Sequence, residues 1–120
     1  MTVIIGFSLG IPTVSPNAQR SEFWAVRHKR VKNERRVAFW ATKANLGRHK
    51  PELVKHVELI RFGRKLLDSH DNLPGCFKGF VDGIADALGV NDAKMSWGYR
   101  QEKGAPSVMV ELHLEAPCDS

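Results

Sequence analysis

Apolar residues recur along the first half of the chain in two patterns, one typical of a strand and one of a helix. Thr2–Leu9 is rich in β-branched and apolar residues and predicts a buried strand. The segment 10–17, with a glycine, two prolines and an asparagine, predicts a loop. From Ser21 to Leu46 no Gly or Pro interrupts the chain, and apolar residues fall at helical spacing. We expect one long helix there, with Ser21 as its N-cap and Gly47 at its end.

The second half of the chain predicts one helix and three strands. The helix runs from about Leu73 to Leu88, where one apolar stripe recurs at helical spacing, and it ends at Gly89. Pro74 fits its first turn, because the N–H group that proline lacks would have no partner there. The strands are expected at Leu53–Phe62, Lys94–Gln101 and Val108–Leu114. In the first of these strands both faces are mixed in polarity, so the sequence does not decide which face points into the core.

These elements occur in the order β-α-β-α-β-β, without an internal repeat, a low-complexity segment or a linker. The order predicts a small α+β fold, in which two helices cover a mixed sheet. A chain of 120 residues has the size of one domain, so we expect a single domain over residues 1–120.

Neither a membrane segment nor a secretion signal is predicted. No apolar run approaches the roughly 18 residues that span a bilayer. The N-terminal strand lacks the basic start and the small-residue cleavage site of a signal peptide. The two cysteines, Cys76 and Cys118, do not make a disulfide framework, which favours a reducing compartment. We therefore expect a cytoplasmic protein, and we expect Cys76 to be a buried side chain rather than a nucleophile.

Charge is unevenly distributed along this basic chain, whose formal net charge is +5. Residues 20–50 carry ten of the eighteen lysines and arginines against two acids, whereas residues 68–92 carry five aspartates against one lysine. A basic fold with one acidic region can hold a phosphate backbone with one part and a metal ion with another. Many ordinary proteins also have uneven charge, so this feature alone leaves a nucleic-acid function open.

The acidic residues of the second half have a spacing that suits a metal site. On a continuous helix, Asp71, Lys78 and Asp82 fall within roughly 20° of one azimuth, away from the apolar stripe. Asp68 precedes this helix and Asp92 follows it. Carboxylate oxygens are ligands that Mg²⁺ prefers, and the ion would polarise a phosphate and help to generate hydroxide. Lys78 would then neutralise the charge that develops on the phosphate.

A purely structural interpretation accounts for the same residues. Asp71 is then a helix cap, Asp82 an exposed partner of Lys78 and Asp92 a turn residue, and spacing alone leaves both interpretations open. Three glycines on this helix, at positions 75, 79 and 83, also lie away from the apolar stripe. Because glycine destabilises a helix, they predict the close approach of a bulky neighbour, either a partner helix or a nucleic-acid backbone.

The acidic segment and the second helix together resemble the signature of RusA-type Holliday-junction resolvases, especially the phage-borne branch. The matching residues are Asp68-Ser69-His70-Asp71-Asn72-Leu73, Lys78, Asp82, and the run from Ala85 to Asp92, with Pro16-Asn17 and Phe23–Arg27 upstream. The similarity covers most of the chain. It implies a bacterial or phage-encoded homodimer that binds branched DNA and cuts paired strands with Mg²⁺ or Mn²⁺, using three aspartates and a lysine.

Carried over by position, the resemblance implies that Asp68, Asp71 and Asp92 hold the metal and that these aspartates and Lys78 are catalytic. Asp71 matches the family's second aspartate and Asp92 its last. The family's spacing places the first acid at position 69, which is Ser69 here, so Asp68 would have to reach in from one residue further away. Supporting contacts around the metal are expected from His70, Asn72 and Asp82.

The middle of the first helix is the densest positive run of the chain. It has two interpretations, as a solvated helix face or as a surface that follows a DNA backbone, and the second is favoured because phosphate contacts dominate the affinity of DNA-binding proteins. Trp24 and Trp40 lie on the same helix. The expected DNA contacts are Arg27, Lys29, Arg30, Lys32, Arg35 and Arg36.

The sequence therefore predicts a structure-selective DNA endonuclease that resolves Holliday junctions or other branched DNA with a divalent metal. No P-loop or GxGxxG motif is present, so we expect no nucleotide cofactor, and the histidines lack the spacing of a zinc site. Two alternatives stay open. One is a non-catalytic or weakly catalytic protein that binds branched DNA on the same fold. The other is a dimerisation or regulatory module that does not bind nucleic acid.

Overall fold

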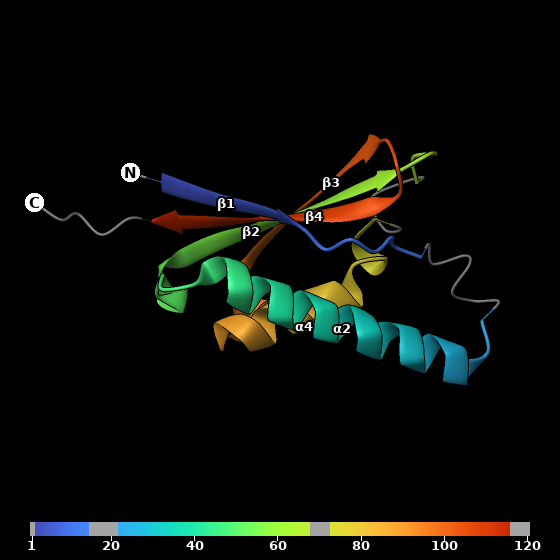
Figure 1. The fold of residues 1–120 in the computed structure, drawn as a ribbon, viewed down its shortest axis with the longest axis horizontal. Coiled ribbons are helices and arrows are strands. Elements are labelled where there is room, and N and C mark those ends of the chain that lie inside the picture. Colours follow the sequence, from blue (N-terminus) through green and yellow to red (C-terminus); the bar gives the residue numbers. More distant parts are fainter. Residues whose placement is uncertain (1, 15–21, 68–72, 116–120) are drawn as a thin grey trace, which may run out of the picture.

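A mixed four-stranded sheet with two helices on one side forms the body of the protein in this computed structural model, which describes residues 2–14, 22–67 and 73–115 (Figure 1). The predicted α+β class and the order β-α-β-α-β-β are confirmed. The elements are β1 (Thr2–Ser8), α2 (Trp24–Leu46), the 3₁₀ turn η1 (Pro51–Leu53), β2 (Val54–Gly63), α4 (Lys78–Leu88), the 3₁₀ turn η2 (Asp92–Lys94), β3 (Ser96–Lys103) and β4 (Ser107–Glu115).

The strands lie in the order β1-β4-β2-β3. β4 is antiparallel to both β1 and β2, whereas β3 is parallel to β2. Consecutive strands β3 and β4 are therefore not neighbours, because β2 lies between them. Their connection crosses the end of β2, where the Gly104 amide donates to the Gly63 carbonyl at 3.0 Å. This arrangement puts β3 at one edge of the sheet.

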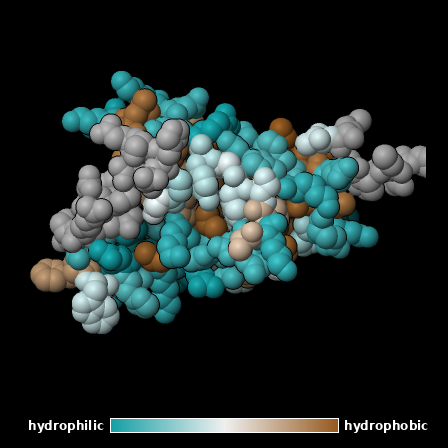
Figure 2. Space-filling view, turned by 180° about the vertical axis from the view of Figure 1, so that it is seen from behind, coloured by the Kyte–Doolittle hydropathy of each residue, from teal (hydrophilic) through white to brown (hydrophobic). Residues whose placement is uncertain are grey.

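Strand alternation separates an apolar face from a polar one. On β4, the predicted alternation is confirmed, since Val108, Val110, Leu112 and Leu114 are all buried. β2 contributes Val57 and Leu59 to the same core, where α4 adds Phe80 and Ile84. Seen from behind, the surface of the described residues is mostly hydrophilic, and apolar atoms show only in separate small areas (Figure 2). The core thus lies between the sheet and the two helices.

The opposite face of the sheet carries a chain of paired polar groups, which explains why β2 is mixed in polarity. His56 Nε2 lies 2.8 Å from Glu58 Oε1, and Arg100 from β3 bonds to the other oxygen of Glu58 at 3.1 Å. Arg100 also lies 3.4 Å from Glu111 of β4, whose Oε1 is 3.3 Å from His113 Nε2. Each of these partly exposed groups therefore has a partner of suitable chemistry.

α2 and α4 pack unusually closely, at two glycines of α4. A Cβ atom added at Gly83 would overlap the backbone carbonyl oxygen of Arg35 and lie 2.9 Å from the Cβ atom of Ala38. A Cβ atom added at Gly79 would lie 2.6 Å from Glu34 Oε1. The predicted close approach is confirmed at both positions, and the neighbour that approaches is α2.

The prediction of one continuous helix from Leu73 to Leu88 is wrong at residues 76–77. Residues 73–75 form a single helical turn, 76–77 form a turn, and α4 begins only at Lys78. Phe77 has φ −102° and ψ 1°, outside the helical range, and its fully buried ring stacks on Tyr99 at 5.7 Å. Because the helix is broken, the alignment of Asp71 with Lys78 does not follow, but Lys78 and Asp82 remain one turn apart.

α2 differs from its prediction at its beginning. The helix starts at Trp24, with Phe23 as an N-cap that makes no side-chain bond, so the prediction of Ser21 as the cap is wrong; Ser21 itself lies outside the described residues. The buried residues of α2 recur every four positions, at Glu34, Ala38, Thr42 and Leu46. Among the described helices, none is both long and apolar enough to cross a membrane.

Candidate functional site

Three of the predicted site residues line one cavity, although they come from different segments. This cavity of about 320 Å³ lies between the first turns of α4, the η2 turn and β3. We call it the acidic cavity, and its lining consists of Pro74, Gly75, Lys78, Val81, Asp82, Asp92 and Tyr99. Lys78 and Asp82 enter it from successive turns of α4, where residues four apart share a face. Asp92 enters it from the η2 turn.

Backbone contacts hold Asp92 at the edge of this cavity. α4 ends at Gly89 in the left-handed conformation, with φ 68°, which turns the chain sharply toward β3. The Asn91 side chain then caps η2 by accepting from the Ala93 amide at 2.9 Å. Trp97 of β3 donates its indole N–H to the Asp92 carbonyl oxygen at 2.7 Å. Because the Trp97 bond reaches the main chain of Asp92, the carboxylate of Asp92 remains among the groups that line the cavity.

Tyr99 lines the acidic cavity, although the sequence analysis did not name it as a site residue. Its ring stacks on Phe77. Burial, and then the negative charge of Asp92, raise the pKa of Tyr99 above its ordinary value. The hydroxyl therefore stays protonated and can donate a hydrogen bond beside Asp92. The alternation of β3, which puts positions 97, 99 and 101 on one face, was the signal for this residue.

Asp68, His70, Asp71 and Asn72 lie outside the described residues. The chain that leads into this segment is held at two points. The side-chain oxygen of Gln101 of β3 accepts a hydrogen bond from the Leu67 amide at 2.8 Å. The side-chain amide of Gln101 donates to the Leu67 carbonyl oxygen at 3.0 Å. Arg61 of β2 donates to the Lys65 carbonyl at 2.9 Å. At the other end of the segment, Pro74 already lines the acidic cavity.

The acidic cavity offers only part of a metal site within the described residues. No group of three His, Cys, Asp or Glu side chains in residues 2–14, 22–67 and 73–115 is arranged to hold a metal ion. Asp82 and Asp92 nevertheless provide the hard oxygen donors that Mg²⁺ prefers. The donor chemistry of the cavity therefore fits a divalent ion that receives further oxygen ligands from elsewhere.

Some cations of α2 line an open hollow, whereas others are paired with carboxylates. Lys29, Lys32 and Arg36 line a shallow hollow of about 300 Å³ together with Asn33, whose side-chain oxygen accepts from Arg36 at 3.3 Å. We call these three cations the outer basic face. Two exposed indoles lie on the same helix, since Trp24 is 80% and Trp40 64% exposed. The outer basic face has the composition expected of a surface that contacts a nucleic-acid backbone.

Two other cations of α2, Arg30 and Arg35, are paired with carboxylates. Arg30 is only 17% exposed and binds Glu22 at 2.9 Å and Glu34 at 2.8 Å. Burial raises the pKa of Glu34, while the neighbouring Arg30 opposes that shift. Arg35 forms an ion pair with Asp86 of α4, at 2.6 Å. The charges of Arg30 and Arg35 are thus already compensated by carboxylates, which distinguishes them from the outer basic face.

Cys76 is buried, as predicted. Its side chain is 1% exposed and donates to the Leu73 carbonyl at 3.0 Å. Burial raises the pKa of the thiol to about 11, so it carries almost no thiolate near neutral pH. Cys76 therefore helps to close the turn before α4 and is unsuited to act as a nucleophile.

Chemically, the acidic cavity combines two carboxylates, an ammonium and a phenol at the surface of the protein. Such a set can bind a hydrated divalent cation and, through Lys78, an anionic group beside it. Comparison of the sequence with models of protein families and with curated proteins finds no match.

Proposed function

We propose that this protein is a structure-selective DNA endonuclease, which hydrolyses phosphodiester bonds in Holliday junctions or other branched DNA with Mg²⁺ or Mn²⁺. The observation that carries the proposal is the meeting of Lys78, Asp82 and Asp92 in one cavity. The resemblance of residues 68–92 to RusA-type resolvases supports the same reaction. We place its action in the cytoplasm, in DNA recombination and repair.

The flanking chain supports the addition of two further acids to this cavity. Asp71 is three residues before Pro74, a lining residue, and three residues of chain span at most roughly 11 Å. Asp68 directly follows Leu67, which Gln101 holds with two hydrogen bonds. Asp68, Asp71 and Asp92 are thus the proposed metal ligands, and His70, Asn72 and Asp82 would support them.

In this mechanism each residue of the cavity has a separate task. A divalent ion bound by the aspartates would polarise the scissile phosphate and lower the pKa of a coordinated water. Lys78 stabilises the negative charge that develops on the phosphate oxygens. Tyr99, which stays protonated beside Asp92, donates a hydrogen bond to the phosphate. Asp82, one helical turn from Lys78, keeps the ammonium oriented toward the cavity.

We further propose that the protein acts as a homodimer. A two-fold axis between two subunits would present two acidic cavities in a symmetric arrangement. A four-way junction has matching symmetry, so paired cuts on opposite strands would follow from the assembly.

Incubation with a synthetic four-way junction, with and without Mg²⁺, tests the proposed function. Paired nicks that require the metal are expected. Salt-dependent binding to the junction without nicking would instead favour the alternative of a non-catalytic or weakly catalytic binding protein. The reason to test this alternative is that position 69, where the family's spacing places its first acid, is a serine. Absence of binding to both branched and linear DNA would contradict both functions and leave the dimerisation or regulatory module.

Replacing Lys29, Lys32 and Arg36 together by glutamine should weaken binding to branched and linear DNA about equally. Each phosphate contact releases counterions, so the slope of log K against log salt should flatten by up to about 3. Fluorescence anisotropy over a salt series measures both effects. The matched control is the triple replacement of Lys43, Arg48 and Lys50, which removes the same charge near the other end of α2. Equal slopes for the wild type and the first variant would show that the outer basic face is merely solvated.

Exchanging the residues at positions 68 and 69 tests whether Asp68 replaces the family's displaced acid. Asp68→Asn should impair cleavage as severely as Asp71→Asn, and the double change Asp68→Ser with Ser69→Asp should preserve or raise the rate. Junction cleavage at several Mg²⁺ concentrations is the measurement, because a lost ligand raises the metal requirement as well as slowing the cut. A harmless Asp68→Asn would transfer its role to His70 or Asp82, beside Asp71 and Asp92.

Gln101→Ala should raise the Mg²⁺ concentration needed for half-maximal cleavage, because it removes both bonds that hold Leu67. The same loss should lower the free energy of unfolding by about 1–2 kcal/mol. Glu102→Ala, at the exposed neighbouring position, is the control and should change neither quantity. An unaltered metal requirement in a destabilised Gln101→Ala protein would limit Gln101 to a structural role.

A further inference from the structure

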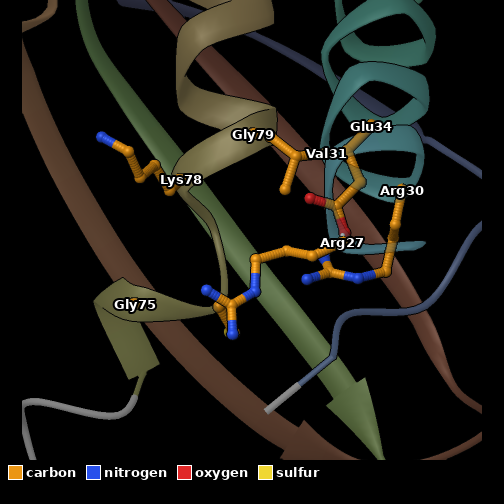
Figure 3. Close-up of a pocket in the computed structure, with 8 residues that line it drawn as sticks. Arg27, Arg30, Val31, Glu34, Gly75, Lys78 and Gly79 are labelled. Carbon is orange, nitrogen blue, oxygen red and sulfur yellow. Dashed lines mark hydrogen bonds and ion pairs between the residues drawn. The ribbon is translucent and has the colours of Figure 1, made fainter. Parts of the chain in front are cut away.

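A second cavity, of about 280 Å³, opens between α2 and the start of α4 (Figure 3). We call it the basic cavity, because its charged lining consists of Arg27, Arg30 and Lys78 against a single carboxylate, Glu34. It shares two lining residues, Gly75 and Lys78, with the acidic cavity. The two cavities are therefore direct neighbours on the surface.

Lys78 lies at the border between the two cavities. Its side chain extends away from Arg27, on the other side of the first turn of α4 (Figure 3). The guanidinium of Arg27, in contrast, reaches from α2 toward the turn that contains Gly75 (Figure 3). Lys78 is thus directed to the acidic cavity, and Arg27 is the cation that extends over the basic cavity.

Arg30 and Glu34 form a fixed part of the wall of the basic cavity. Arg30 binds Glu22 and Glu34 through three nitrogen atoms, at 2.8 to 3.3 Å, so its orientation is set within the protein. Glu34 is 3% exposed and packs against Gly79, where no side chain would fit. Arg30 and Glu34 are therefore held in place on one side of the cavity, which they line together with Arg27.

We propose that the basic cavity binds the DNA phosphate next to the scissile phosphate on the same strand, with Arg27 as its principal ligand. A guanidinium matches the geometry of a phosphate with two parallel hydrogen bonds. Gly75, which has no side chain, lines the part of the cavity toward which the Arg27 guanidinium reaches (Figure 3). Because the cavities adjoin at Lys78, one strand can occupy both with successive phosphates. This inference rests on the proposed endonuclease function.

Single neutral linkages in the substrate test the inference. A set of four-way junctions, each with one methylphosphonate at a chosen position near the cut, is compared for Kd in the absence of metal. For the wild-type protein, a neutral linkage adjacent to the cut should weaken binding about tenfold. Arg27→Gln should weaken binding to the unmodified junction by a similar factor, and the neutral linkage at that position should then cause no further loss.

Two further variants control this experiment. Arg27→Lys keeps the charge but loses the paired donors, so its Kd for the unmodified junction should lie between those of the wild type and Arg27→Gln. Arg35→Gln removes a guanidinium of the same helix that is paired with Asp86, and it should stay additive with every neutral linkage. Thermal unfolding of each variant verifies that the fold is retained.

The outcomes separate this inference from the proposed function. One outcome is that the wild type cuts junctions while the losses of binding caused by Arg27→Gln and by each neutral linkage simply add. In that case Arg27 does not contact the adjacent phosphate, and this inference is overturned while the proposed function stands. If the coupling is found in a protein that does not cut, the phosphate subsite stands and the nuclease assignment fails. If the wild type binds no DNA, both are overturned.

Discussion

Replacing Asp92 by asparagine is expected to abolish Mg²⁺-dependent cleavage of a four-way junction while leaving binding of the junction intact or tighter. Asp92 is the one proposed metal ligand that the described residues place in the acidic cavity. Mutation of residues that support metal ligands already lowers metal affinity or activity by roughly 10–100-fold. Loss of a direct ligand should therefore slow cutting by at least about 100-fold. Removal of a negative charge beside the phosphate relieves repulsion, which favours binding.

The fold should tolerate this change. The contacts that position residue 92 are made by its main chain, including the bond from Trp97, and asparagine has nearly the same volume as aspartate. Single-turnover cleavage measured over a range of Mg²⁺ concentrations, together with binding in the absence of metal, distinguishes a lost ligand from a misfolded protein. Asp86→Asn is the matched control, because Asp86 lies on α4 but pairs with Arg35 outside the cavity. A normal cutting rate in Asp92→Asn would contradict the assignment of the acidic cavity as the active site.

The fold class could be predicted because local patterns and tertiary packing agree in most elements. The alternation in β4 coincides with its buried face, and the apolar stripe of the second helix coincides with the side that packs on the sheet. The order of strands could not be predicted in the same way. Nothing local to β3 and β4 indicates that β2 separates them, because pairing between strands depends on contacts distant in sequence.

The break before α4 shows where tertiary packing overrides local preference. Residues 73–88 have the periodicity of a single helix, but Phe77 leaves the helical range, and its buried ring stacks against Tyr99. Tyr99 comes from an edge strand 22 positions later, so periodicity around residue 77 contains no sign of this contact. For that reason the predicted alignment of Asp71 with Lys78 on one face of a continuous helix does not follow.

Of the candidate site, spacing and resemblance predicted the residues that carry charge but not those that position them. Lys78, Asp82 and Asp92 were predicted, whereas Tyr99 and Gln101 were not, because their proximity to the acidic residues depends on the register of β3 against β2. Among the cations of α2, the pairing of Arg30 with Glu34 could have been found from their separation of four residues.

Gly83→Ala is expected to destabilise the protein by about 2–3 kcal/mol, in the range of overpacked cores. At an exposed helical position the same change would stabilise by roughly 1 kcal/mol, since alanine is the better helix former. Here the added methyl group would overlap the Arg35 carbonyl oxygen and press on Ala38, and backbone atoms cannot turn aside as a flexible side chain can.

Denaturant unfolding of Gly83→Ala measures this effect, and an unchanged m-value would confirm that the two-state transition is retained. Gly6→Ala is the matched control, because an added Cβ there meets its nearest neighbour at 4.0 Å, and the change should stay within about 0.5 kcal/mol. A stabilised Gly83→Ala protein would contradict the close packing of α2 on α4. Since α4 carries Lys78 and Asp82 while Asp92 is held by β3 through Trp97, a displaced α4 should also slow junction cleavage in the fraction that remains folded.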